Sequence, residues 1–247
     1  MSDVTLVAVT SVAIGPTVDA LRASMRQVQF GQVLLLSDQP PPGGTGPQIE
    51  WRRIDRLASR VDYSRFMLRQ LAEHIAGSHA LCIQWDGFVL DGERWNRRFL
   101  EYDYVGAPWP HFDDGRNVGN GGFSLRSRRL LDACTRLPFD GTESEDVVIS
   151  RLCRPFLEEQ GMRFAPEDVA REFAYERTRA TGREFGFHGA FNLVRYLPPS
   201  DALQLFRSLD PKVLAKSEHW ELVRWALAHG RLRLALVLLR RLLSTQD

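Results

Sequence analysis

Asp86 is the residue with the clearest capacity for metal chemistry, because it follows a buried apolar run that ends at Ile83. The carboxyl ends of strands are where α/β sheets bind ligands. A carboxylate there suits a hard divalent cation, which keeps waters and substrate phosphates as its other ligands. An ordinary turn before Gly87 accounts for this acid equally well.

A glycine-rich segment, Gly119–Leu125, has glycines at 119, 121 and 122 and leads into an apolar run. Glycine allows a backbone to approach a ligand closely. The segment is neither the phosphate loop with its lysine nor the dinucleotide fingerprint. A tight turn that enters a strand is the alternative explanation.

Two further sites carry titratable side chains in distinctive settings. Glu145 and Asp146 begin a predicted helix, where the helix dipole favours acids for structural reasons. The functional alternative is a carboxylate base held rigidly by that helix. His188 lies between Gly186 and Gly189, and a neutral imidazole there could bind a metal. A purely structural histidine is the competing interpretation.

Alternating strands and helices must position these residues. Continuous apolar runs at Val4–Val9, Val33–Leu36 and Ala80–Ile83 predict strands buried on both faces. Helical spacing of apolar residues lies within Thr17–Phe30 and Tyr63–Ile75. This alternation predicts an α/β sandwich with a largely parallel sheet.

The pattern continues less regularly through the middle of the chain. Ile49–Ile54 and Tyr104–Gly106 read as strands, and Trp95–Phe99 reads as a helix. Glu145–Gln160 reads as one helix, with Gly161 as its C-terminal cap.

The end of the chain has a different composition. Ser200–Ser208, Lys216–His229 and Leu232–Leu243 predict three consecutive helices. We therefore expect a catalytic domain over residues 1–197 and a helical extension over residues 198–247.

Composition limits the classes of function. The 247 residues carry 32 basic and 31 acidic side chains, a formal net charge of +1. This balance provides no field that would hold a nucleic-acid backbone, so we expect no nucleic-acid partner. Cys82, Cys134 and Cys153 have no spacing typical of disulfides or zinc, which indicates buried thiols. The sequence shows neither a signal peptide nor a spanning segment, so a cytoplasmic protein is expected.

Five segments in the same order resemble a bacterial family of domains of unknown function that is placed among the glycosyltransferases of the GT-A fold. The segments are Gln84–Leu90, Tyr102–Pro110, Gly119–Arg126, Glu145–Val148 and Phe185–Asn192. The resemblance spans about residues 4–195. It implies a GT-A-like, Rossmann-like αβα sandwich with a mixed, mostly parallel sheet, followed by the helical tail.

The resemblance also implies residue roles. Asp86 and His188 match the positions that bind a divalent metal, Mn²⁺ or Mg²⁺, at the diphosphate of the donor. Asp146 matches the base of inverting enzymes, and Glu145 is its neighbour in the catalytic pair. Gln84 stands where the family pattern of the fold has its first acid, which puts the need for the metal in question.

Other residues are expected to contact substrates because of their places at strand ends and in loops. The expected donor-binding residues are Thr10, Ser11, Asp38, Gln84 and Trp85. The expected acceptor- or sugar-binding residues are Trp109, Asn120, Gly121, Gly122 and Glu176. Trp109 has a core role as its alternative, and Glu176 is a second candidate base.

The expected activity is inverting transfer of a hexosyl group from a nucleoside-diphosphate sugar to a hydroxyl of a bacterial glycan or lipid-linked acceptor, in polysaccharide biosynthesis. One alternative is a binding module of the same shape without turnover, which Gln84 favours. A nucleotidyltransferase would need a second strand-end acid for two metals, and none is placed convincingly.

The last predicted helix combines leucines with arginines at 231, 233, 240 and 241. Such a helix could lie on the inner face of an anionic membrane. Packing on its own domain, or on a second subunit in a homodimer, explains the same pattern.

Overall fold

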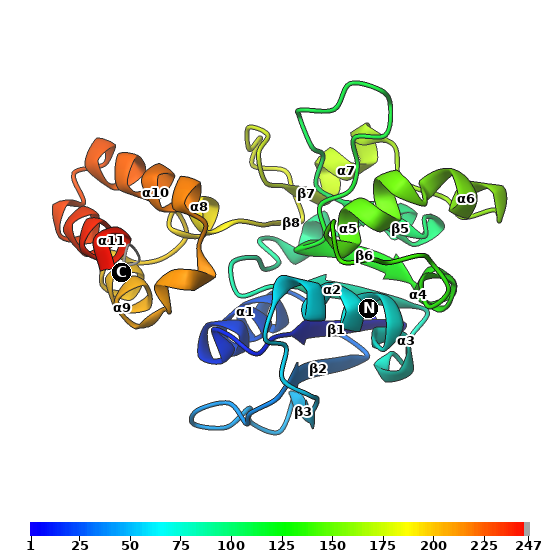
Figure 1. The fold of residues 1–247 in the computed structure, drawn as a ribbon, viewed down its shortest axis with the longest axis horizontal. Helices are drawn as coiled ribbons and strands as arrows, with labels where there is room; N and C mark the ends of the chain where they lie inside the picture. The colour runs from blue at the N-terminus through cyan, green and yellow to red at the C-terminus, as the bar shows by residue number, and fades with distance from the viewer. Residues whose placement is uncertain (245–247) are drawn as a thin grey trace. The chain divides into compact units, whose positions relative to one another are not determined.

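The computed structural model describes residues 1–244 and divides the chain into two compact units, Met1–His188 and Gly189–Asp247 (Figure 1). The sequence placed this division after residue 197. It falls earlier because the short helix α8 (Ala190–Leu193) packs with α10 (Lys216–Ala228) of the second unit.

A six-stranded sheet forms the centre of the first unit, in the order β3-β2-β1-β4-β6-β5. The strands are β1 (Val4–Val9), β2 (Gln32–Ser37), β3 (Glu50–Arg53), β4 (His79–Ile83), β5 (Tyr104–Gly106) and β6 (Phe123–Ser127). The first four strands run parallel to one another, whereas β6 is antiparallel to both β4 and β5. The predicted mixed, mostly parallel sheet is therefore confirmed.

Alternate side chains of β1 enter two separate cores, which explains its uninterrupted apolar sequence. Leu6 and Ala8 pack in the core that includes residues of α1 (Ile14–Gln27) and α7 (Glu167–Phe173). Val7 packs in the core on the other side of the sheet. That second core takes its helical residues from α2 (Arg60–Arg69), α3 (Leu71–His74) and α4 (Arg128–Cys134). The sheet is thus covered on both faces, as a three-layer α/β fold requires.

The segment predicted as one helix from Glu145 to Gln160 consists of three pieces. These are α5 (Glu145–Val147), a π-helical turn (Val148–Leu152) and α6 (Arg154–Glu159). Pro155 lies in the first turn of α6, where its missing N–H costs no hydrogen bond, and this explains the break. Gly161 follows with a φ of 80°, as its predicted capping role requires.

Several short elements carry no clear sequence pattern. The segment Trp95–Phe99, predicted as a helix, is not an α-helix. A 3₁₀ turn, Gly92–Arg94, precedes it, and a second 3₁₀ turn, Arg97–Glu101, overlaps its end. A two-stranded parallel sheet joins β7 (Ala174–Tyr175) and β8 (Gly186–Phe187). Two residues per strand are too few to show any periodicity.

The second unit is helical, as predicted. It contains α8, α9 (Pro199–Ser208), a 3₁₀ turn (Pro211–Val213), α10 and α11 (Leu232–Ser244). The helices α9, α10 and α11 match the three predicted segments to within one residue at every end. None of the described helices is both long and apolar enough to cross a membrane. Cys82, Cys134 and Cys153 of the first unit are buried free thiols.

Candidate active site

The carboxyl ends of three neighbouring parallel strands gather several predicted residues along one edge of the sheet. Thr10 and Ser11 follow β1, Asp38 follows β2, and the segment 84–86 follows β4. The pairings of Val9 with Leu36 and of Ala8 with Ile83 keep these ends level. The sheet topology therefore places Thr10, Ser11, Asp38 and the segment 84–86 at the same edge of the sheet.

The strands β7 and β8 bring Glu176 and His188 together. Tyr175 pairs with Phe187 in this small parallel sheet, so the residues that follow them lie side by side. The His188 N–H donates to the Tyr175 carbonyl at 3.1 Å. The imidazole Nδ1 lies 3.2 Å from Glu176 Oε1.

His188 lies between two carboxylates. Its Nε2 is 3.3 Å from Asp86 Oδ1, on the opposite side of the ring from Glu176. All three side chains are nearly buried, with 13% or less of each exposed. Burial by itself lowers the pKa of His188, but the negative charges of Asp86 and Glu176 raise that pKa well above its usual value.

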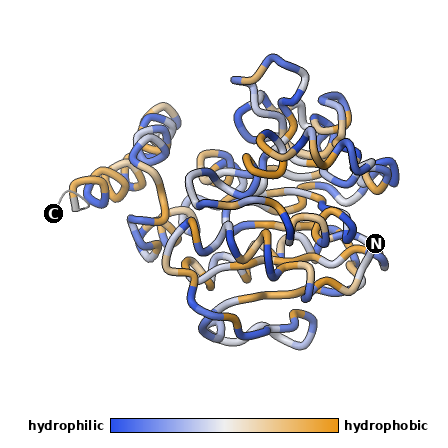
Figure 2. Tube along the Cα trace, turned by 45° about the vertical axis from the view of Figure 1, so that its right-hand side comes forward, coloured by the Kyte–Doolittle hydropathy of each residue, from blue (hydrophilic) through white to orange (hydrophobic). Residues whose placement is uncertain are grey.

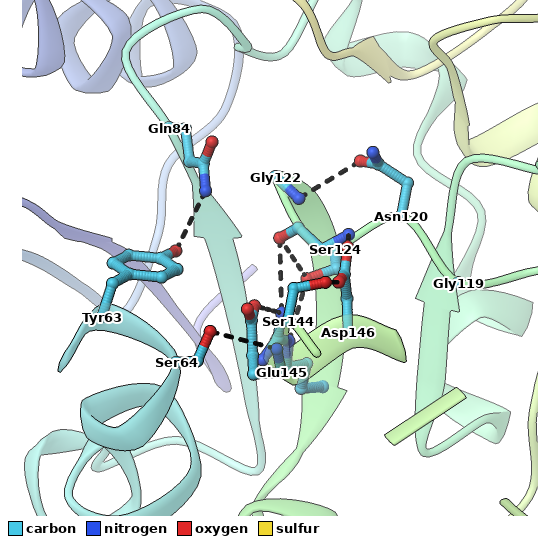
Figure 3. A network of polar contacts seen from close by, with 12 residues as sticks. Tyr63, Ser64, Gln84, Gly119, Asn120, Gly122, Ser124, Ser144, Glu145 and Asp146 are labelled. Carbon is cyan, nitrogen blue, oxygen red and sulfur yellow. Dashed lines mark hydrogen bonds and ion pairs between the residues drawn. The ribbon is translucent and has the colours of Figure 1, made fainter. Parts of the chain in front are cut away.

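Two amides complete this group. The Gln84 side-chain oxygen lies 3.2 Å from His188 Nε2, and its amide nitrogen donates to the Tyr63 hydroxyl at 3.1 Å (Figure 3). Asn120 Nδ2 lies 3.3 Å from His188 Nδ1. The Asn120 side-chain oxygen accepts the Gly122 N–H at 3.2 Å (Figure 3). We call Gln84, Asp86, Asn120, Glu176 and His188 the histidine cluster.

The glycine loop lies between the histidine cluster and the acidic start of α5. A Cβ atom on Gly122 would be 2.1 Å from His188 Nε2. A Cβ atom on Gly121 would be 2.8 Å from Asp146 Cβ and 2.9 Å from Glu145 Oε1. Both positions therefore require glycine, because the backbone there packs directly against these side chains.

Asp146 is held through both carboxylate oxygens. Its Oδ2 accepts the Gly121 N–H at 3.0 Å, and its Oδ1 accepts the Val147 N–H at 2.9 Å. The Ser144 hydroxyl also donates to Oδ1. The residue is half-buried, so its carboxylate is oriented without being fully enclosed.

Glu145 differs sharply from its neighbour because it is buried against Arg126. Arg126 Nη2 donates to Glu145 Oε1 at 3.0 Å, and the side chains are 0% and 5% exposed. Burial raises the pKa of Glu145, Asp146 raises it further, and the guanidinium opposes both. Arg126 also donates to the Ser124 hydroxyl within the interior.

Trp109 occupies the place of a core residue. It is 7% exposed, and a Cβ atom on Gly119 would be 2.2 Å from its ring. The ring therefore packs on backbone, which contradicts the expected open sugar-stacking surface and supports the core alternative. Trp85 is half-buried.

The predicted residues after β1 take part in loop structure. The Thr10 hydroxyl accepts the Val12 N–H at 3.0 Å, and the Ser11 hydroxyl accepts the Leu57 N–H at 2.9 Å. Asp38 has a buried carboxylate oxygen, Oδ1, without a hydrogen-bond partner. Ala13, which begins α1, adopts a φ of 49°, a strained value that sequence patterns did not reveal.

The histidine cluster offers a limited donor set for a cation. Among residues 1–244, no three His, Cys, Asp or Glu side chains are grouped to hold a metal ion. Glu176 contacts the far nitrogen of the imidazole, so it does not converge with Asp86. Asp86 Oδ1 is nevertheless buried with no hydrogen-bond partner apart from its 3.3 Å contact with His188 Nε2, and Gln84 supplies an amide oxygen beside the same nitrogen. Two oxygens and one nitrogen fit a divalent ion that takes its remaining ligands from water and phosphate.

Residues 48–188 match a family described as proteins of unknown function, DUF5672, and the chain belongs to this family. No curated protein is similar to the chain in sequence. Among solved structures, the chain is similar to a mannosyltransferase from Pyrobaculum calidifontis in complex with GDP-Man and Mn²⁺. The TM-score is 0.48 at 12% identity over 68% of this chain, which spans 55% of the length of that protein.

Proposed function

We propose that the protein is a glycosyltransferase that moves a sugar from a nucleoside-diphosphate donor to an acceptor hydroxyl. The observation that carries the proposal is the glycine pair Gly121–Gly122, which contacts His188 on one side and Asp146 on the other. His188, which is suited to the donor diphosphate, and Asp146, the candidate base, therefore lie against the same short backbone segment.

Asp86, His188 and the Gln84 amide oxygen would hold a divalent cation, Mn²⁺ or Mg²⁺. Such a cation, when bound, stabilises the negative charge that develops on a leaving diphosphate. Glu176 keeps the imidazole ring in place through Nδ1. A metal-binding imidazole is neutral, so His188 would release its Nε2 proton as the cation binds. The carboxylates of Asp86 and Glu176 beside the ring attract that cation.

Asp146 is the proposed general base. Its half-buried carboxylate takes the proton from the acceptor hydroxyl as the hydroxyl oxygen attacks the anomeric carbon. Hydrogen bonds from Gly121, Ser144 and Val147 fix the direction of the carboxylate. A single base acting opposite the leaving group inverts the configuration, so the proposed enzyme is an inverting hexosyltransferase.

We assign supporting or nucleotide-binding roles to other predicted residues. Thr10, Ser11 and Asp38 lie at the strand ends where a nucleotide would bind in this class of sheet. Trp85 is a half-buried aromatic surface beside Asp86. Glu145 supports the site through its ion pair with Arg126 and does not contact substrate.

The acceptor is proposed as a glycan hydroxyl, free or on a lipid carrier, in bacterial polysaccharide synthesis at the cytoplasmic side of the membrane. A balanced net charge of +1 accords with a small charged donor held locally and with no nucleic-acid partner.

Thermal unfolding with nucleoside diphosphates, with and without Mn²⁺, tests the proposal. A nucleotide at a hundredfold excess over its Kd should stabilise the protein by about 2.7 kcal/mol, a rise in Tm of about 5–10 °C. Asp86→Asn should remove the part of the shift that depends on Mn²⁺. Asp19→Asn, the same change on a side chain that is 79% exposed, should retain it. The proposal fails if no nucleotide shifts the Tm of the unaltered protein with any metal.

A binding module without turnover is the second candidate, and Gln84 in the histidine cluster favours it. Gln84 supplies a neutral oxygen, so it binds a cation more weakly than a carboxylate would. Consumption of a nucleoside-diphosphate sugar in the presence of Mn²⁺ separates the two candidates. Binding of the donor without its consumption, across a panel of acceptor glycans, would favour the module.

A further inference from the structure

Most of the large apolar side chains that are exposed among the described residues belong to the second unit. Nine large apolar side chains are exposed among the described residues, and six belong to this much shorter unit. Five of the six are on its last two helices. They are Trp220 and Leu227 on α10, and Leu232, Leu236 and Leu243 on α11.

The leucines of α11 form two distinct stripes. Leu234, Leu238 and Leu242 are at most 4% exposed and pack inside the unit. Leu232 and Leu236, one turn apart, are 62% and 56% exposed, and Leu243 continues this stripe two turns later. Packing of the helix on its own unit therefore accounts for only one of the two stripes. In Figure 2 the corresponding helix, beside the C label, is predominantly orange.

The exposed stripe is bordered by positive charge. Arg233 and Arg240 are exposed, and on a helix of 3.6 residues per turn they lie along one edge of the leucine stripe. The helix contains no acidic residue. The whole second unit has nine Lys or Arg residues against five Asp or Glu residues, although the chain as a whole is nearly neutral.

We propose that the face of α11 with Leu232, Leu236 and Leu243 binds the surface of an anionic lipid membrane. Leucines that enter the headgroup region leave water, while arginines at their edge meet lipid phosphates. A symmetric pair of α11 helices from two copies would bring these arginines together with no acid on the helix to neutralise them. The charge pattern therefore favours lipid over a second copy.

The exposed Trp220 of α10 fits the same partner. Its side chain is 49% exposed, and Leu227 lies two turns further on the same helix face, with Arg224 exposed between them. Tryptophan favours the boundary between water and lipid, because its ring is apolar and its N–H still finds a hydrogen-bond partner there. The repeated combination of large apolar side chains and arginine distinguishes both helices from an ordinary solvated surface.

Co-sedimentation of the full chain with lipid vesicles tests the proposal. The protein should sediment with vesicles of phosphatidylcholine and phosphatidylglycerol mixed in equal amounts, and much less with pure phosphatidylcholine. Leu232→Glu and Leu236→Glu should each weaken partitioning by about tenfold. Arg233→Gln and Arg240→Gln should each weaken it by about fivefold, and added salt should reproduce this loss.

Leu152→Glu is the matched control, because Leu152 is also 62% exposed but belongs to the first unit. It should sediment like the unaltered protein, and circular dichroism should show that all variants are folded. Equal sedimentation of Leu232→Glu and the unaltered protein, or no sedimentation at all, would overturn the proposal. So would light scattering that shows a dimer converted to a monomer by Leu232→Glu without vesicle binding. None of these readings depends on glycosyl transfer.

Discussion

Arg126 and Glu145 form an ion pair beneath the glycine loop, with Nη2 and Oε1 3.0 Å apart and both side chains almost fully buried. The same Arg126 nitrogen lies 3.4 Å from the Gly121 carbonyl, while the Gly121 N–H donates to Asp146. The pair thus supports the backbone that orients the proposed base.

Removing one partner of this pair should be costly. Glu145→Gln should lower the free energy of unfolding by about 3 kcal/mol, because a buried guanidinium loses its counter-charge. Urea unfolding monitored by circular dichroism measures the loss. Asp132→Asn breaks an exposed ion pair, in which Arg128 is 44% and Asp132 is 54% exposed. This change should lower the free energy of unfolding by less than about 1 kcal/mol. Equal losses in the two variants would contradict the buried pair.

Asp146→Asn should slow sugar transfer by about 10²–10⁴-fold, because an amide cannot accept the acceptor proton. The nucleotide-induced rise in Tm should persist, since the histidine cluster is unchanged. Initial rates of nucleoside-diphosphate release measure the first effect, and thermal unfolding measures the second. Asp19→Asn is again the exposed control. Full activity of Asp146→Asn would remove Asp146 from the role of base.

Gly122→Ala should destabilise the first unit and disturb its site together. The added Cβ would be 2.1 Å from His188 Nε2, and Asp86 and Glu176 restrict the imidazole. Overpacking of this kind costs about 2 kcal/mol, which lowers Tm by about 4–8 °C. Gly15→Ala on α1 meets nothing within 4 Å and should leave Tm unchanged or raise it. An unchanged Tm in Gly122→Ala would show that the loop is not tightly packed.

The lowered pKa of Asp103 makes the stability of the protein depend on pH, with stability decreasing at acidic pH. Burial opposes its ionisation, but hydrogen bonds from Arg129, Ser127 and the Arg163 N–H lower the pKa of Asp103 below its usual value of 3.8. The stabilisation is therefore complete above the unfolded pKa and is lost as the pH falls through the lowered folded pKa.

Asp103→Asn should accordingly cost about 2 kcal/mol at pH 7 and progressively less below pH 3.8. Urea unfolding of both proteins from neutral to acidic pH measures the difference. A difference that stays constant across this range would mean that the charge of Asp103 contributes nothing.

Local sequence patterns were sufficient to predict the α/β class and the candidate segments. Runs such as Val4–Val9 must be buried on both faces of a sheet, because every second residue enters a different core. The three tail helices follow equally from their local spacing of apolar residues. The glycines at 121 and 122 indicated that the backbone lies close to other groups there. The sequence did not show which groups these are.

The contacts between these residues arise from the three-dimensional fold and could not be predicted from the sequence. His188 lies beside Asp86 and Glu176 because the two-residue strands β7 and β8 pair in parallel, and such short strands have no pattern of their own. Nothing in the local sequence distinguishes Arg126 from the many other arginines of the chain, yet Arg126 is buried against Glu145. Charge partners and burial depend on contacts between residues distant in sequence, and local sequence patterns do not encode those contacts.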